Sequence, residues 1–387
     1  MLKCAVIGVG AAGNKAAIAL LEAGVMSTKD VILLNSTLKD VPAQYKEIAI
    51  EFEGNSKGCA KERHLAQSLA MTNLQSRNLG IDQLIQGDDY NFVLICTSAE
   101  GGTGSGASIT LAKYIHQVLQ KPVHLTVFAG FFNDSRGLKN TVDWFKETSK
   151  DYTVDCICNS YFLDENNGNE RKAEQAANME FVERVKILLG KQLVDSETNI
   201  DDVDLEKLVI TPGYQMVVHG DLGKPKNKEE YNKIVRHYID EARGFSTEAS
   251  ATRIGLVLNI SEKIDDAVDY SSSVIKDVYG EPFEFFTHVQ RIEAQGNYIN
   301  IIVSGSKLPI EEIEEIYEEF QARKAKVDTS ADEFFSKDFD TSADEFDMAR
   351  GRISDSQIDK NRAAFFGEPT PKQGKGKFTE TKKVDEM

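Results

Sequence analysis

The chain has 387 residues, of which 41% are hydrophobic, and its formal net charge at pH 7 is −17. This length suits two domains with additional segments, and the apolar content is ample for a buried core. The acidic excess argues against a general affinity for nucleic acid, because neutralisation of phosphate charge dominates such binding. We therefore expect little direct binding of nucleic acid.

The cysteines and the lengths of the apolar runs indicate the cellular compartment in which the protein works. Cys4, Cys96, Cys156 and Cys158 lie in strand-like apolar runs, where cysteine usually acts as a small buried hydrophobic residue. No stretch of about 18 apolar residues occurs, and the chain runs from its first residues straight into a strand and a glycine loop. We expect a reducing, cytoplasmic location, with no targeting segment and no membrane partner.

The first half of the chain alternates short apolar runs with helix-like stretches. The predicted strands are 3–8, 31–35, 91–97, 123–128 and 154–159, and the predicted helices are 11–23, 61–75 and 105–119. This alternation predicts an α/β fold with a parallel, Rossmann-like sheet and helices on both faces. Such sheets bind ligands beyond the carboxyl ends of their strands.

The second half of the chain has a different pattern. A long striped stretch at 170–193 predicts a central helix, and the runs after it, several of which follow one another directly, predict a smaller α+β domain. Its predicted strands are 207–220, 253–260, 283–292 and 298–305, and its predicted helices are 228–243, 263–279 and 309–326. The expected division is a first domain at 1–169, the central helix at 170–198, an α+β domain at 199–308, a C-terminal helix at 309–326 and a flexible tail at 327–387.

The tail carries two unusual features. The heptapeptide DTSADEF at 328–334 recurs at 340–346, and it is either a docking motif or a solvated linker. The last residues are rich in lysine, which is typical either of contact with DNA or acidic partners or of a solubilising tail.

Two glycine-rich loops follow predicted strands. The first is GVGAAGN, from Gly8 to Asn14, and the second is GGTGSG, from Gly101 to Gly106. Such loops let the backbone approach a phosphate, whose charge is favoured at a helix N-terminus. Two of them on neighbouring strands imply a polyphosphate ligand.

The first loop alone is typical of a dinucleotide site, which expects an acidic residue at the end of the second strand. That strand ends instead in Asn35, and no GxxxxGK[ST] motif is present. An NAD-dependent oxidoreductase is therefore a remote alternative, and it leaves GGTGSG and the later motif NIDDVD unexplained.

These motifs resemble those of the tubulin/FtsZ superfamily. Gly101–Gly106 matches the signature GGTG[ST]G in full, and NIDDVD, from Asn199 to Asp204, fits the family pattern NxDxxD. The resemblance covers roughly residues 1–325 in element order and is tight only at the motifs. It implies a GTPase that uses GTP, GDP and Mg²⁺.

The resemblance also implies a set of nucleotide-binding residues. Asn159 and Asn178 match positions that read guanine, and an amide can both donate to and accept from a base edge. The third phosphate loop differs from that of cell-division FtsZ, and its Lys57 and Lys61 could contact phosphate or could be ordinary surface lysines. The implied nucleotide-binding residues are Gly10, Ala11, Ala12, Gly13, Asn14, Asn35, Lys61, Gly101, Gly102, Thr103, Gly104, Ser105, Gly106, Asn159 and Asn178.

Catalysis is implied for Asn199, Asp201 and Asp204. In the family this loop enters the nucleotide site of the next subunit, and its acids orient the water that attacks the terminal phosphate. No residue is assigned as a metal ligand. A site divided in this way requires head-to-tail self-assembly, which generates open filaments.

The departures from FtsZ fit best with the divergent plasmid and phage tubulins of the TubZ and PhuZ groups. That resemblance implies a filament that segregates or positions DNA, with the C-terminal tail contacting neighbouring subunits or a DNA-bound adaptor protein. A cell-division scaffold similar to FtsZ is the alternative.

Overall fold

A computed structural model describes residues 1–54, 57–130, 134–194, 196, 200–242, 244–245, 250–261, 264 and 266–338, with side chains up to residue 324. The chain forms two compact units, Met1–Lys324 and Ala325–Met387. The second copy of the repeat and the lysine-rich end lie outside the described residues, as do the side chains of the first copy.

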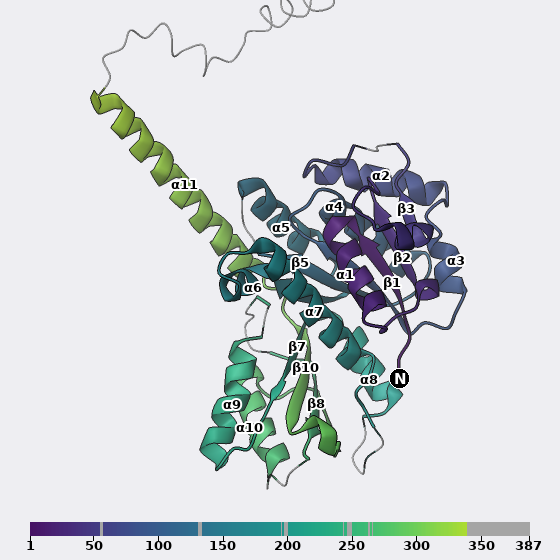
Figure 1. Ribbon diagram of the computed structural model, residues 1–387, viewed down its shortest axis with the longest axis vertical. Helices are drawn as coiled ribbons and strands as arrows, with labels where there is room; N and C mark the ends of the chain where they lie inside the picture. The colour runs from purple at the N-terminus through teal and green to yellow at the C-terminus, as the bar shows by residue number, and fades with distance from the viewer. Residues whose placement is uncertain are drawn as a thin grey trace, which may run out of the picture. The chain divides into compact units, whose positions relative to one another are not determined.

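One ten-stranded, mostly parallel sheet runs through the first unit (Figure 1). Its strand order is β3-β2-β1-β4-β5-β6-β7-β10-β8-β9, and only β10 runs antiparallel to its neighbours. The strands are β1 (Cys4–Val9), β2 (Val31–Asn35), β3 (Ala49–Glu51), β4 (Phe92–Ser98), β5 (Val123–Ala129), β6 (Thr153–Cys158), β7 (Gly213–Asp221), β8 (Arg253–Asn259), β9 (Glu284–Gln290) and β10 (Tyr298–Ser306). The predicted α/β class with a parallel, Rossmann-like sheet is confirmed.

Helices cover both faces of the sheet, as predicted. Buried apolar side chains of α1, α7 and α8 form one core, and those of α2, α4, α5, α9 and α10 form the other. The α-helices are α1 (Gly10–Glu22), α2 (Arg63–Gln75), α3 (Ile81–Gln86), α4 (Thr103–Gln117), α5 (Ser135–Glu147), α6 (Asn159–Glu165), α7 (Glu170–Leu188), α8 (Asp202–Ile210), α9 (Lys228–Asp240), α10 (Ala267–Tyr279) and α11 (Ile310–Asp338). Short 3₁₀ helices occur at Thr28–Asp30, Ala43–Ile48 and Glu293–Gln295.

Three predicted elements are wrong in part. The predicted C-terminal helix at 309–326 continues as α11 to Asp338, so it enters the segment that was predicted as a flexible tail. The predicted strand at 207–220 begins only at Gly213, because its first residues belong to α8, where Leu205, Leu208 and Val209 are buried with helical spacing. The predicted helix at 170–193 ends at Leu188, and Gly190 has a φ of +69°, a left-handed conformation that favours glycine.

The sheet does not stop at the predicted boundary between the first domain and the α+β domain. Strand β6 pairs in parallel with β7, so the two parts share one continuous sheet. The domain boundaries themselves stay a prediction. In the described part of the chain, no helix is both long enough and apolar enough to span a membrane.

Candidate functional site

Two helices begin at the glycine loops, on neighbouring strands. Helix α1 follows β1, and α4 follows β4, which pairs directly with β1. A Cβ at Gly10 would lie 2.9 Å from the main-chain nitrogen of Gly104, so the two loops are in contact. Among the described residues, no side chain caps either helix start. The first N–H groups of both helices are therefore available to an anion.

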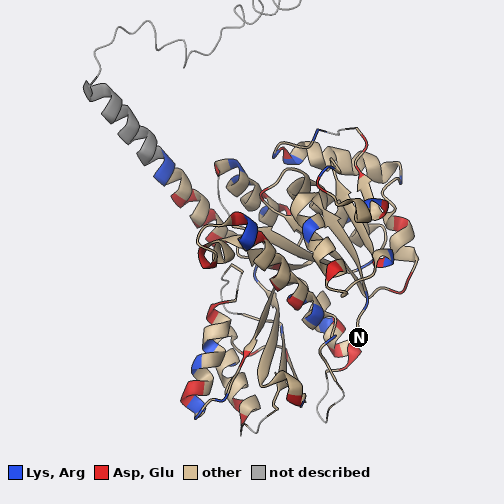
Figure 2. Cartoon of the chain, viewed as in Figure 1, with Lys and Arg blue, Asp and Glu red and all other residues tan. Residues whose placement is uncertain are grey.

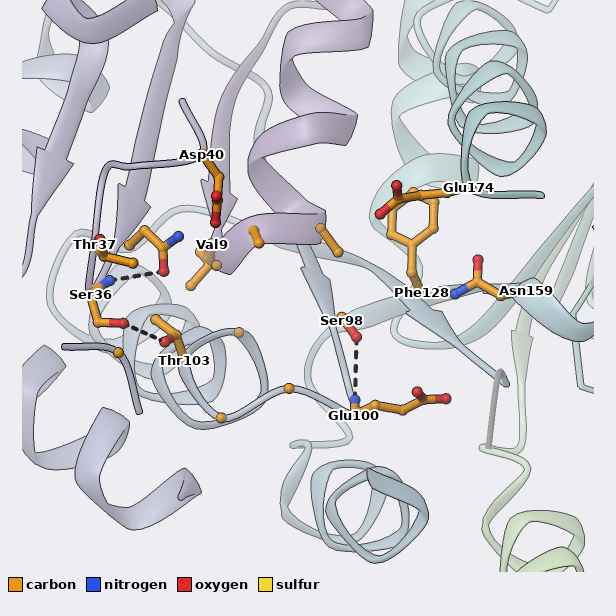
Figure 3. A pocket seen from close by; sticks show the side chains of 18 of the residues that line it. Val9, Ser36, Thr37, Asp40, Ser98, Glu100, Thr103, Phe128, Asn159 and Glu174 are labelled. Atoms are coloured by element: carbon orange, nitrogen blue, oxygen red, sulfur yellow. Dashed lines mark hydrogen bonds between the residues drawn. The ribbon is translucent and has the colours of Figure 1, made fainter. Parts of the chain in front are cut away.

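A cavity of about 380 Å³ lies at these two loops. Figure 3 shows Ser36, Thr37, Asp40 and Thr103 on one side of it and Phe128, Asn159 and Glu174 on the other. The cavity is lined by Val9, Gly10, Ala11, Ala12, Asn35, Ser36, Thr37, Asp40, Gly58, Ser98, Glu100, Gly101, Gly102, Thr103, Gly104, Phe128, Asn159, Glu174, Ala177 and Asn178.

The side of the cavity beside α4 is built from hydroxyl and amide groups. The hydroxyls of Ser36 and Thr103 are 2.7 Å apart and buried, and the Asn35 side-chain oxygen accepts a hydrogen bond from the main-chain N–H of Ser36 at 2.9 Å. These contacts fix the loop after β2 against the first turn of α4. The predicted Asn35 thus lines the cavity and also orders its neighbours.

The opposite side is formed by β5, α6 and α7. Asn159 begins α6 directly after β6, and Asn178 lies on α7. Arg184 of α7 donates to the carboxylate of Asp155 on β6 at 2.6 Å, and both side chains are buried. Burial raises the pKa of Asp155, while the charge of Arg184 opposes that rise. This ion pair holds α7 against β6, so it fixes the elements that carry the two asparagines.

The cavity is acidic in its side chains. Its lining within the described chain includes the carboxylates of Asp40, Glu100 and Glu174 and no lysine or arginine. Glu174 pairs with Lys15 at 2.7 Å, and Glu100 accepts a hydrogen bond from the main-chain N–H of Gly130 at 2.8 Å. A phosphate bound here would be held mainly by main-chain N–H groups and helix N-termini.

Five of the predicted nucleotide-binding residues do not line the cavity. Gly13 and Gly106 are contact points between elements: a Cβ would lie 2.0 Å from the Cys96 carbonyl oxygen and 2.2 Å from that of Arg63, respectively. The Ser105 hydroxyl donates to the Gly101 carbonyl. Asn14 is 3% exposed, and its side-chain atoms find no hydrogen-bond partner among the described residues.

Lys61 is the fifth of these residues. Its ammonium pairs with Asp134 instead of entering the cavity, and its main chain packs against Gly102. Two hydrogen bonds lower the pKa of Asp134 below 3.8. The larger effect comes from the Lys61 ammonium, and the next from the main-chain N–H of Gly137. Asp134 also caps the start of α5. Lys61 therefore joins α5 to the loop before α2.

The predicted catalytic acids Asp201 and Asp204 lie near the start of β1, whereas the cavity lies beyond the end of that strand. The carboxylate of Asp201 caps α8 by accepting a hydrogen bond from the main-chain N–H of Asp204 at 2.8 Å. Asp202 pairs with the Met1 nitrogen, just before β1, whereas the glycine loop follows the opposite end of β1. Six residues of strand span about 20 Å. One copy of the chain thus does not bring these acids to its own cavity; Asn199 lies outside the described residues.

Several lining residues were not predicted. Ser36 and Thr37 directly follow β2, so the rule that ligands bind beyond the carboxyl ends of parallel strands could have found them. The same rule applies to Ser98, the last residue of β4, to Glu100 just after that strand and to Phe128 near the end of β5. Glu174 lies one helical turn before Asn178 on α7, and that spacing was its only signal.

No family model matches the chain. Solved structures match it at low identity and high coverage. A GTPγS-bound protofilament of CetZ2 from Haloferax volcanii has a TM-score of 0.67 at 17% identity, covering 84% of this chain and 100% of that one. A GTPγS-form protofilament of TubZ from Bacillus thuringiensis serovar israelensis has a TM-score of 0.69 at 17% identity, with 86% and 94% covered. An empty FtsZ dimer from M. jannaschii has a TM-score of 0.58 at 18% identity, with 79% and 88% covered.

These likenesses define the class of fold. The chain is built as a tubulin/FtsZ fold, with the two glycine loops beside one cavity, as the resemblance of its motifs predicted. At this level of identity, the likeness concerns the fold alone.

Proposed function

We propose that this protein binds and hydrolyses GTP and assembles head to tail into filaments. The observation that carries the proposal is the placement of the cavity and the acidic start of α8 at opposite ends of β1. A second copy stacked in the same orientation presents its Asp201 and Asp204 to the cavity of the first. The structures of CetZ2 and TubZ that share this fold are GTPγS protofilaments, which supports both the nucleotide and the assembly.

The two ends of such a site have separate tasks. The loops before α1 and α4 hold the phosphates through main-chain N–H groups, and Asn159 and Asn178 lie where a base can be read by amide hydrogen bonds. Asp201 and Asp204 of the neighbouring copy orient the attacking water. Phosphoryl transfer depends mainly on positioning and charge stabilisation, so a divided site can remain inactive until copies meet.

The cavity also fits a magnesium ion. Mg²⁺ commonly binds through one or two carboxylates together with substrate phosphates, and Asp40 and Glu100 supply carboxylates in a lining that has no cationic side chain in the described chain. Within the described residues no cluster of three His, Cys, Asp or Glu side chains forms a metal site by itself. When bound with the nucleotide, Mg²⁺ would neutralise charge on the phosphates.

For the cellular role, we propose segregation or positioning of plasmid or phage DNA through a DNA-bound adaptor. The third phosphate loop and the lysine-rich end support this role over that of a cell-division scaffold, which remains the second candidate. Blue and red segments are mixed along the helices on the side drawn in Figure 2. Together with the net charge of −17, this favours an adaptor over direct DNA binding.

The first experiment measures phosphate release from GTP as a function of protein concentration, with light scattering recorded on the same samples. We expect release to stay near zero below a threshold and to rise together with scattering above it. Release proportional to protein at every concentration, or no release, would contradict the shared site. Binding of NAD without hydrolysis of GTP would favour the oxidoreductase alternative instead.

Removal of residues 327–387 tests the role of the tail. Unchanged assembly and hydrolysis would support a cargo or adaptor function, because the first unit alone then suffices for the filament. A raised assembly threshold would assign the tail to contacts between subunits.

A further inference from the structure

A cluster of polar side chains on β9 and β10, most of them buried, contacts the segment between α7 and α8. We call the residues His288, Gln290, Tyr298 and Asn300 the loop anchor. His288, Gln290 and Asn300 are 2%, 3% and 4% exposed. Their partners Gln192, Val194 and Ile200 lie in the segment that leads into Asp201. Buried polar groups that lack hydrogen-bond partners destabilise a fold. The segment before α8 supplies these partners, so the contacts hold that segment against β9 and β10.

Gln290 is the centre of the loop anchor, and its amide is fully hydrogen-bonded. Its oxygen accepts from the Val194 main-chain N–H and from the His288 ring, each at 3.0 Å. Its nitrogen donates to the Gln192 carbonyl at 3.0 Å and to the Tyr298 hydroxyl at 2.5 Å. The two main-chain partners fix which end of the amide is which, because a carbonyl only accepts and an N–H only donates.

His288 extends this network to the residue before Asp201. Its Nδ1 accepts from the Ile200 main-chain N–H at 3.4 Å, so Nε2 carries the proton that is donated to Gln290. Asn300 completes the cluster by donating to the Gln192 side-chain oxygen at 2.9 Å. The main chain is thus held at Gln192, Val194 and Ile200.

We propose that Gln290, with His288, is a positioning residue. It sets the position and orientation of the Asp201 carboxylate, which acts in hydrolysis in the neighbouring copy. The inference rests on the proposed function. Ile200 is 5% exposed and directly precedes the residue that caps α8, so a shift of its main chain moves the carboxylate. Hydrolysis is sensitive to such a shift, because a misplacement of about 1 Å can slow a reaction on the order of a hundredfold.

The loop anchor lies apart from the nucleotide cavity, so its effects on turnover and on nucleotide affinity can be separated. Gln290 and His288 lie on β9, and none of the loop anchor residues lines the nucleotide cavity. Loss of the amide should therefore lower turnover without changing the affinity for nucleotide. A residue that merely supported the fold would affect both.

The test compares the full chain with its Gln290→Met variant, which keeps the length of the side chain and removes its four hydrogen bonds. We expect turnover per assembled subunit to fall on the order of 10- to 100-fold, with the GTP dissociation constant within about twofold of the wild-type value. The matched control is Asn297→Leu. Asn297 is another buried amide, 4% exposed, and its side-chain partners among the described residues, Gly223 and Ser261, lie outside the segment before α8.

Turnover of Gln290→Met equal to that of wild type, or reduced only as far as in Asn297→Leu, would overturn the proposal. If Gln290→Met does not fold, Tyr298→Phe decides, because it removes only the hydroxyl that accepts from Gln290. A several-fold loss of turnover at unchanged affinity supports the proposal, and unchanged turnover overturns it. Absence of GTP hydrolysis in the wild-type chain would instead contradict the proposed function itself.

Discussion

The hydroxyl groups of Ser36 and Thr103 lie 2.7 Å apart in the interior, although the two residues are 67 positions apart in sequence. This contact holds the loop after β2 at the start of α4, where the phosphates would be bound.

Replacement of Thr103 by valine keeps the shape of the side chain and removes this contact. We expect affinity for GTP to fall about tenfold, or about 1.4 kcal/mol, because Ser36 loses a buried partner and the loop is less well ordered. Equilibrium binding of a fluorescent GTP analogue measures the change. Thr110→Val on the same helix, outside the cavity lining, is the control. Equal affinity of the Thr103 variant and wild type would contradict the prediction.

The acids at the start of α8 are tested by conversion to amides. Asp201→Asn keeps an oxygen that can cap the helix and removes the charge. We expect turnover to fall about a hundredfold or more in Asp201→Asn and Asp204→Asn, with binding of GTP and assembly retained.

Asp202→Asn is the control for these variants, since Asp202 lies in the same turn but is not assigned to the attacking water. Phosphate release and sedimentation on the same samples separate turnover from assembly. A variant of Asp201 that failed to bind nucleotide would show that this residue does not act on the neighbouring copy.

Two adjacent glycines allow a matched test of packing. A Cβ at Gly102 would lie 2.8 Å from two main-chain atoms of Lys61, whereas a Cβ at Gly101 would meet nothing within 4 Å. Gly102→Ala should lower the free energy of unfolding by about 1–3 kcal/mol, and Gly101→Ala should change it by less than about 0.5 kcal/mol. Denaturant unfolding of both variants measures this difference, and equal effects would exclude close packing as the reason for glycine at 102.

His124 on β5 predicts a dependence of stability on pH. Its ring is fully buried, packs against Phe92 and has no hydrogen-bond partner among the described residues. Burial lowers the pKa of His124 from 6.5 to about 3. Below pH 6.5 the unfolded chain therefore binds a proton that the folded chain does not, so stability falls as the pH decreases from 6.5 toward 3.

His124→Leu should remove this part of the dependence. We expect the difference in free energy of unfolding between variant and wild type to grow in the variant's favour as the pH falls, approaching about 1.4 kcal/mol per pH unit. Unfolding at pH values on both sides of 6.5 gives the two slopes. Parallel slopes would show that His124 can be protonated in the folded protein.

The sequence predicted the parallel part of the sheet well, because strands buried on both faces are continuous apolar runs. Strand β2 spans Val31–Asn35, as predicted, and β5 differs from the prediction by one residue. Periodicity failed for α8, whose run of Leu205, Leu208 and Val209 next to β7 looks continuous with that strand. Helix α5 was missed, although it buries Trp144 and Phe145.

The candidate site was predictable where glycine itself carries the signal. The loops at Gly10 and Gly104 meet because main-chain atoms approach closely, and that need is visible in the sequence. Contacts between distant side chains were not predictable. The pairing of Lys61 with Asp134 depends on the loop before α2 meeting the start of α5, and no local pattern records that approach.

The cavity and the start of α8 lie at opposite ends of β1, and this has a consequence for counting. A row of stacked copies contains one fewer completed site than it contains cavities, since the cavity at one terminus faces no acids. The nucleotide there would outlast the others until another copy arrives. The two termini of such a row would therefore differ chemically. One terminal copy would keep its nucleotide intact, while the copies behind it would hydrolyse theirs in the order in which their sites were completed.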